Sequence, residues 1–135
     1  MAEPLGLVID RANAYGGTIH HWHDGDTAAV LVWDALLQAR VLLDCRLRGI
    51  NAPELTAAGG VEVRDAVWAA VPPDTAVTIR DVGPYPRPGH VTCTVSTPSI
   101  PDLSVWLLER GFAVRYSGVG PRPEVPWPPV PPAAP

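Results

Sequence analysis

Lysine is absent from this sequence of 135 residues, and all 10 basic residues are arginine. They are outnumbered by 14 aspartate and glutamate residues, which gives a formal net charge of −4. Proteins that hold nucleic acid by bulk electrostatics present a basic surface, so this balance argues against that mode of binding. Any contact with nucleic acid must therefore be local. The exclusive use of arginine, with abundant alanine, proline, glycine and valine, is typical of a GC-rich coding sequence, such as that of a GC-rich bacterium or its virus.

The sequence also lacks a long apolar run, since no stretch approaches the ~18 residues of a membrane span. The N-terminal residues carry Glu3 and Asp10, and they lack the basic region followed by an apolar region that marks a secretory signal. We therefore expect a cytoplasmic monomer with no membrane partner.

Cysteine is scarce, with only Cys45 and Cys93, both in segments typical of strands. Two interpretations are open: buried free thiols, which behave as small apolar side chains, or a structural disulfide. The absence of a secretory signal favours free thiols.

Proline is abundant and makes up more than half of residues 121–135. Because proline cannot donate to a strand ladder or sit inside a helix, this stretch falls outside the domain. We predict an N-terminal extension over 1–14, one domain over 15–118 and a proline-rich tail over 119–135. The composition of the tail favours a disordered, polyproline II-like extension, and the alternative is a docking ligand for a protein partner with Trp127 as its anchor.

Short segments rich in strand-forming residues alternate with two helical segments. In the third predicted strand, buried-type residues Leu43, Cys45 and Leu47 alternate with charged ones, which is the period of a half-buried strand. The predicted strands cover 17–23, 27–33, 39–50, 76–80 and 90–95, and the helices cover 61–71 and 102–109. Five short strands interrupted by a helix indicate an OB barrel, so we predict a mainly β fold with a five-stranded barrel and two helices. Its core is expected to include Trp33, Trp68 and Trp106.

Four motifs follow one another at a recognisable spacing. They are Asp24-Gly-Asp-Thr27, Arg46-Leu-Arg-Gly-Ile-Asn-Ala-Pro-Glu54, Tyr85-Pro-Arg87 and Leu107-Leu-Glu-Arg-Gly-Phe-Ala113. In this order and over residues 15–116, the chain resembles the staphylococcal nuclease (thermonuclease) family. The first motif alone is common in turns, and the second, about twenty residues later, makes the resemblance specific.

The resemblance implies hydrolysis of DNA or RNA phosphodiesters with a bound Ca²⁺ ion. Asp26 matches the family's metal carboxylate, Asn51 stands where a second metal carboxylate usually lies, and Ala52 stands where a backbone carbonyl completes the site. Glu54 matches the glutamate that positions or deprotonates the attacking water.

The resemblance also implies that Arg46 and Arg87 bind the reacting phosphate, for which the planar guanidinium fork is suited. Two such charge-assisted contacts, strengthened in the transition state, would supply several powers of ten in rate. Arg48, two residues from Arg46, is expected to be an ordinary charge on the strand face. Tyr85 and Tyr116 are candidates to stack on a nucleobase.

The sequence departs from the family pattern at three places. Asn51 is neutral, which predicts weaker Ca²⁺ binding because affinity depends on ligand charge. Pro86 replaces the glycine usually found before the second arginine, and no third helix follows Tyr116. Two functions therefore stay open: an active nuclease, or a catalytically inactive OB module that binds nucleic acid or a protein.

A histidine-rich stretch precedes the first motif. His21 and His23 share a face of the predicted strand, as two metal ligands would. No third ligand follows at a suitable spacing, so we interpret these residues as ordinary strand histidines.

Overall fold

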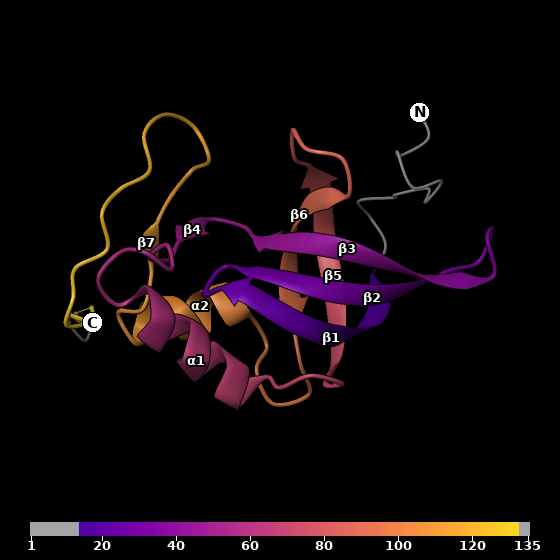
Figure 1. Ribbon diagram of the computed structural model, residues 1–135, viewed down its shortest axis with the longest axis horizontal. Helices are drawn as coiled ribbons and strands as arrows, with labels where there is room; N and C mark the ends of the chain where they lie inside the picture. The colour runs from indigo at the N-terminus through magenta and orange to yellow at the C-terminus, as the bar shows by residue number, and fades with distance from the viewer. Residues whose placement is uncertain (1–13, 133–135) are drawn as a thin grey trace.

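The computed structural model describes residues 14–132, which form a barrel with two helices against one end (Figure 1). The strands are β1 (Tyr15–Asp24), β2 (Thr27–Asp34), β3 (Ala39–Leu47), β4 (Ile50–Asn51), β5 (Ala76–Pro84), β6 (His90–Ser96) and β7 (Val114–Arg115). The helices are α1 (Gly60–Ala70) and α2 (Leu103–Glu109). Neither helix of the described residues has the length and hydropathy needed to cross a membrane.

Five of the strands form a closed barrel in the order β1-β2-β3-β6-β5. All pairs are antiparallel except β3 with β6, which run parallel. The structure thus confirms the predicted fold class, a mainly β protein with a five-stranded barrel and two helices, consistent with an OB-fold.

The core is centred on the inner face of the barrel and the apolar faces of the helices. Val63 and Val67 of α1 and Leu103 and Leu107 of α2 are fully buried there. Trp22, which sequence reasoning did not place in the core, is 2% exposed, and its Nε1 donates to the carbonyl of Val71 at 3.0 Å.

The three tryptophans predicted to lie in the core differ in their exposure to solvent. Trp68 and Trp106 are half-buried and pack against the core. Trp33 is 57% exposed, so its prediction was wrong. Its neighbours Val32 and Asp34 are each 2% exposed, and because successive strand residues face opposite sides, Trp33 points outward.

The two cysteines are free and buried. A hydrogen bond with Cys93 and burial raise the pKa of the Cys45 thiol. The structure therefore has the free-thiol arrangement, with both side chains inside the barrel.

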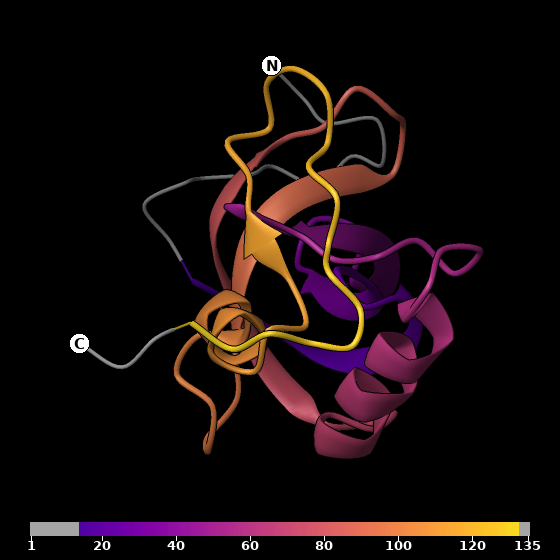
Figure 2. The same ribbon diagram turned by 90° about the vertical axis from the view of Figure 1, so that its left-hand side faces the viewer.

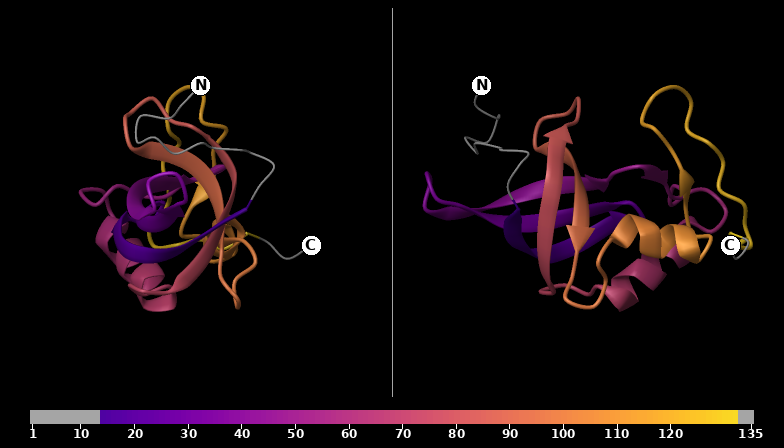
Figure 3. Two further views of the ribbon diagram at one scale, coloured as in Figure 1. Left: turned by 90° about the vertical axis from the view of Figure 1, so that its right-hand side faces the viewer. Right: turned by 180° about the vertical axis from the view of Figure 1, so that it is seen from behind.

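The predicted third strand breaks before its expected end. β3 stops at Leu47, Gly49 turns with φ +79°, and Ile50–Asn51 forms β4, which pairs with β7. This small second sheet lies at the end of the barrel that the helices cover (Figure 3). It brings Asn51 beside the C-terminal part of the chain.

After β7 the chain forms a loop and returns across the same end of the domain (Figure 2). Residues 119–132 of the predicted tail contain no helix or strand. They nevertheless contact the domain, which composition does not reveal. We call residues 117–130 the strap.

Candidate active site

Asp26 is a buried carboxylate in the tight turn between β1 and β2. The turn is closed by the Asp24 side chain, whose Oδ1 accepts from the Asp26 backbone N–H at 3.1 Å. Asp26 is only 1% exposed, and a charge so buried requires polar partners. Its Oδ2 accepts from the backbone N–H of Ala52 at 2.9 Å, and its Oδ1 accepts from the Thr27 hydroxyl at 3.1 Å.

Arg46 provides the charged partner of this carboxylate. It lies on β3 directly opposite Thr27, and its side chain is 11% exposed. Nη1 donates to Asp26 Oδ1 and Nη2 donates to Asn51 Oδ1, each at 3.4 Å. The guanidinium fork therefore spans two of the predicted metal ligands. Arg48 is exposed, and its Nη1 donates to the carbonyl of Asp81 at 2.6 Å.

Asn51 is held at both ends of its side-chain amide. Oδ1 accepts from Arg46, while Nδ2 donates to the carbonyl of Pro123 in the strap at 3.0 Å. Asn51 is 6% exposed and the following Ala52 is 3% exposed. Asp26, Arg46, Asn51 and Ala52 thus form one directly bonded cluster.

Glu54 lies next to this cluster without bonding to it. It shares a cavity of about 400 Å³ with Asn51, Arg122 and Pro123, which we call the glutamate cavity. The Glu54 side chain is 68% exposed and lies 3.6 Å from Arg122 Nη1. An exposed carboxylate beside a cavity can accept a proton from a bound water, or orient that water.

The two predicted base-stacking residues face a second cavity. Tyr85, Tyr116, Arg46 and Arg122 line a space of about 600 Å³, the tyrosine cavity. The Tyr116 hydroxyl donates to the carbonyl of Gly120 at 2.6 Å, so this ring is tied to the start of the strap.

Arg87 lies in the β5–β6 loop, where its side chain is exposed. With Arg46, His23 and Asp24 it lines a third space of about 340 Å³, the histidine cavity. The structure therefore places both predicted phosphate-binding arginines on one cavity wall, although Arg87 makes no side-chain hydrogen bond within the described residues.

Asp24 has an electrostatic role that the sequence did not reveal. Burial, and then the neighbouring charge of Asp26, raise the pKa of Asp24 to about 7. Two carboxylates that resist simultaneous ionisation favour a nearby cation. The sequence signal was the first acidic residue of the first motif, a motif that is on its own common in turns.

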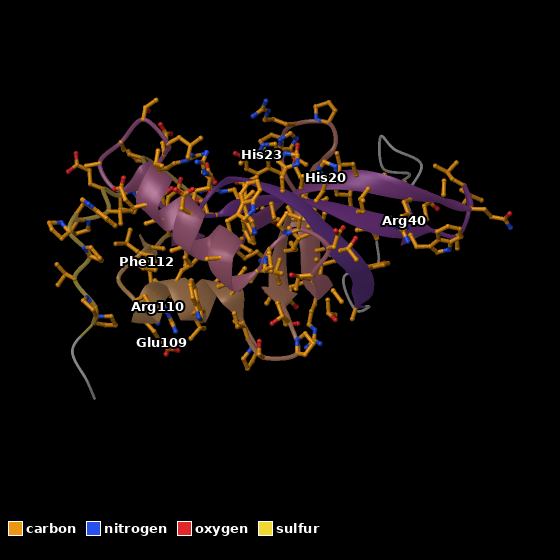
Figure 4. All side chains as sticks on the ribbon, turned by 60° about the horizontal axis from the view of Figure 1, so that its bottom comes forward. His20, His23, Arg40, Glu109, Arg110 and Phe112 are labelled. Atoms are coloured by element: carbon orange, nitrogen blue, oxygen red, sulfur yellow. The ribbon has the colours of Figure 1, made fainter. Side chains whose placement is uncertain are left out.

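Two histidines, His23 and His90, lie beside Asp44. Figure 4 labels His23 and its neighbour His20 on β1. His23 Nε2 lies 2.7 Å from Asp44 Oδ1, and His90 Nε2 lies 3.3 Å from Asp44 Oδ2. Burial and the neighbouring His23 and His20 lower the pKa of His21. His90, distant in sequence from the others, was missed because no local motif contains it.

The side chains around Asp26 supply only part of the oxygen ligands that a hard cation such as Ca²⁺ needs. Within residues 14–132, no group of three or more His, Cys, Asp or Glu side chains is arranged to hold a metal ion. A site at Asp26 would therefore need neutral oxygens, such as the Asn51 amide or a backbone carbonyl, as Ca²⁺ sites commonly use. The buried Asp26 carboxylate is the acidic oxygen donor of such a site.

Comparison with known proteins adds no family assignment. No model of a known protein family matches the chain, and no curated protein matches it either. The resemblance to the staphylococcal nuclease family therefore depends on the motifs and on the site they build.

Proposed function

We propose that this protein hydrolyses phosphodiester bonds in DNA or RNA at the cluster around Asp26, with Ca²⁺ as cofactor. The observation that carries the proposal is the contact of the buried Asp26 carboxylate with Arg46, which also reaches Asn51. Barrel closure brings these residues together from the first and second motifs, as the resemblance requires.

Each residue has a chemical role in this proposal. Asp26, with the Asn51 amide and the Ala52 carbonyl, would hold the cation, which supplies Lewis-acid stabilisation of the phosphate when bound. Arg46 would donate to the phosphate oxygens as negative charge develops on them. Glu54 would orient the attacking water, and Tyr85 and Tyr116 would contact a neighbouring base in the tyrosine cavity.

A direct test is incubation of the purified protein with denatured DNA and with RNA, in Ca²⁺ or in a chelator. We expect Ca²⁺-dependent cleavage, and cleavage that persists in chelator would overturn the metal mechanism. Glu54→Gln should lower the cleavage rate by about 10²-fold or more, the range of general acid–base effects. Glu62→Gln, at an exposed position of α1, is the matched control and should leave the rate unchanged.

A specific observation favours the second candidate, an OB module that binds without cleaving. Both oxygens of Asp26 accept hydrogen bonds within the protein, and the Asn51 amide is used at both ends. A site satisfied in this way is stable without an ion. The cleavage assay separates the two candidates, since a binding module would retain DNA or RNA without shortening it.

A further inference from the structure

The strap is attached to the domain at two points that follow Pro123 along the chain. Trp127 is half-buried against the core and its ring lies against Gly59, where α1 begins. Farther along, the backbone of Val130 lies so close to Gly111 that a Cβ there would be 2.7 Å from the Val130 carbonyl carbon. Both glycines have positive φ, which glycine adopts at no steric cost. Because glycine has no side chain, the strap can lie directly against the backbone at each position.

A third attachment lies inside the site. The hydrogen bond from Asn51 Nδ2 to the Pro123 carbonyl fixes the strap backbone at 3.0 Å from the directly bonded cluster. The next residue toward the N-terminus, Arg122, is therefore held over the site.

Arg122 reaches all three cavities described above. It lines the glutamate, tyrosine and histidine cavities. Arg46, of the directly bonded cluster, lines the tyrosine and histidine cavities as well. Arg122 Nη2 donates to the Tyr85 hydroxyl at 3.3 Å, and Arg122 Nη1 lies 3.6 Å from Glu54 Oε1. These contacts are long, and the side chain is 42% exposed, so the guanidinium keeps donors available for a ligand.

We propose that Arg122 is a phosphate-binding residue of this site, supplied by the strap, for a single-stranded DNA or RNA substrate. This inference rests on the proposed function and extends it. Arg46, the phosphate donor of the proposed function, also contacts Asp26 and Asn51, and Arg87 is exposed on a loop with flanking prolines, so Arg122 would add a further phosphate contact. Arg122 is the arginine that stands between the water-orienting Glu54 and the Tyr85 ring, where a phosphate next to a stacked base would lie.

The proposal also gives Asn51 a reason to be neutral. A carboxylate at position 51 would face the Pro123 carbonyl without a hydrogen to donate, and two acceptors repel. The amide allows one side chain to accept from Arg46 and to hold the strap that carries Arg122.

The test measures binding without cleavage. A fluorescein-labelled single-stranded 12-mer DNA is titrated with the protein in chelator, and anisotropy gives Kd at several salt concentrations. We expect Arg122→Ala to raise Kd about tenfold, the loss of one charge-assisted contact, and to reduce the slope of log Kd against log salt by about 0.7. Arg122→Lys should restore the slope and only part of the affinity, because the ammonium keeps the charge but not the fork.

Arg80→Ala is the matched control. Arg80 is exposed on β5 and lines none of the three cavities, so the same change in net charge should alter Kd less than twofold. Thermal unfolding of each variant shows whether the fold is retained.

Three outcomes decide the matter. Equal Kd for wild type and Arg122→Ala, or tighter binding by the variant, overturns the role of Arg122 and leaves the proposed nuclease untouched. Binding that depends on Arg122 without any cleavage in Ca²⁺ supports the phosphate contact and overturns hydrolysis. A wild-type protein that neither binds nor cleaves overturns both.

Discussion

Asn51 joins two parts of the molecule through a single amide. Its oxygen accepts from the Arg46 guanidinium in the barrel, and its nitrogen donates to the Pro123 carbonyl in the strap. Because Arg46 can only donate and the carbonyl can only accept, these two partners fix the orientation of the amide. The contacts of Asn51 on both sides therefore explain why an amide suits this position.

Replacing Asn51 by aspartate removes the hydrogen bond to Pro123 and adds a negative charge, and the Ca²⁺ dependence of cleavage reports the effect of the charge. Asn51→Asp adds a charged oxygen beside Asp26, and we expect a lower Ca²⁺ concentration for half-maximal cleavage, because Ca²⁺ affinity rises with ligand charge. The measurement is cleavage rate against free Ca²⁺ for both proteins. An unchanged midpoint would place Asn51 outside the coordination shell.

Asp24 makes stability depend on pH. Burial and the charge of Asp26 raise its pKa from 3.8 to about 7, so the folded state favours the protonated carboxyl. The stability that this group contributes is fully present below about pH 4 and is lost as the pH rises through 7. The substitution Asp24→Asn keeps an acceptor for the Asp26 N–H and removes the charge.

We therefore expect Asp24→Asn to be more stable than wild type at pH 8, with the advantage shrinking toward pH 4. Urea unfolding in chelator at both pH values gives the comparison. A stability difference that does not change with pH would contradict the assigned shift.

At the scale of elements, the strap substitutes for secondary structure at the end of the barrel. It has no helix or strand, yet Trp127 covers the start of α1 and the segment near Val130 covers Gly111 after α2. The Trp127 ring, the close approach of the Val130 backbone to Gly111 and the hydrogen bond from Asn51 to Pro123 hold it in place.

Removal of this ring tests the attachment. We expect Trp127→Ala to lower the free energy of unfolding by about 1–3 kcal/mol, the range for loss of a partly buried large side chain. Trp33→Ala is the control, since Trp33 is 57% exposed on the far side of β2 and should change stability by less than about 0.5 kcal/mol. Denaturant unfolding measures both losses of stability. A larger loss for Trp33→Ala than for Trp127→Ala would show that the strap does not dock.

The barrel elements were predictable because local signals agree with the tertiary structure. Leu43, Cys45 and Leu47 alternate with charges and are all buried as expected. Trp33 was misplaced because an aromatic side chain outweighed the alternation, which puts it outside. Arg122 and His90 escaped detection, since their neighbours in space come from distant segments and no periodicity or motif connects them.

Part of the candidate site was also predictable from the sequence. The motifs indicated that Asp26, Arg46, Asn51 and Ala52 belong together, and the structure brings them into direct contact. The raised pKa of Asp24 depends on burial, and the position of the strap depends on the break between β3 and β4. No local sequence pattern predicts either the pKa of Asp24 or the position of the strap.

At the scale of the molecule, an acidic protein gathers three arginines at one cavity, which Asp24 and Asp44 also line. Net charge is −4, yet Arg46, Arg87 and Arg122 all line the histidine cavity. The net charge predicts weak long-range attraction of a polyanion, and the proposed affinity for nucleic acid would come from a few short contacts. Arg46 comes from β3, Arg87 from the β5–β6 loop and Arg122 from the strap, so closure of the barrel and the return of the strap together bring them to this cavity.

The most direct measurement compares two arginines that are two residues apart on the same chain. Both side chains line the tyrosine cavity, but Arg46 bonds to Asp26, whereas Arg48 is exposed, bonds to the carbonyl of Asp81 and makes no side-chain hydrogen bond to the directly bonded cluster within residues 14–132. In Ca²⁺-dependent cleavage of single-stranded DNA, we expect Arg46→Ala to lower the rate by about 10²-fold or more and Arg48→Ala to leave it nearly unchanged. Equal losses, or activity that survives without Arg46, would contradict the phosphate site at its centre.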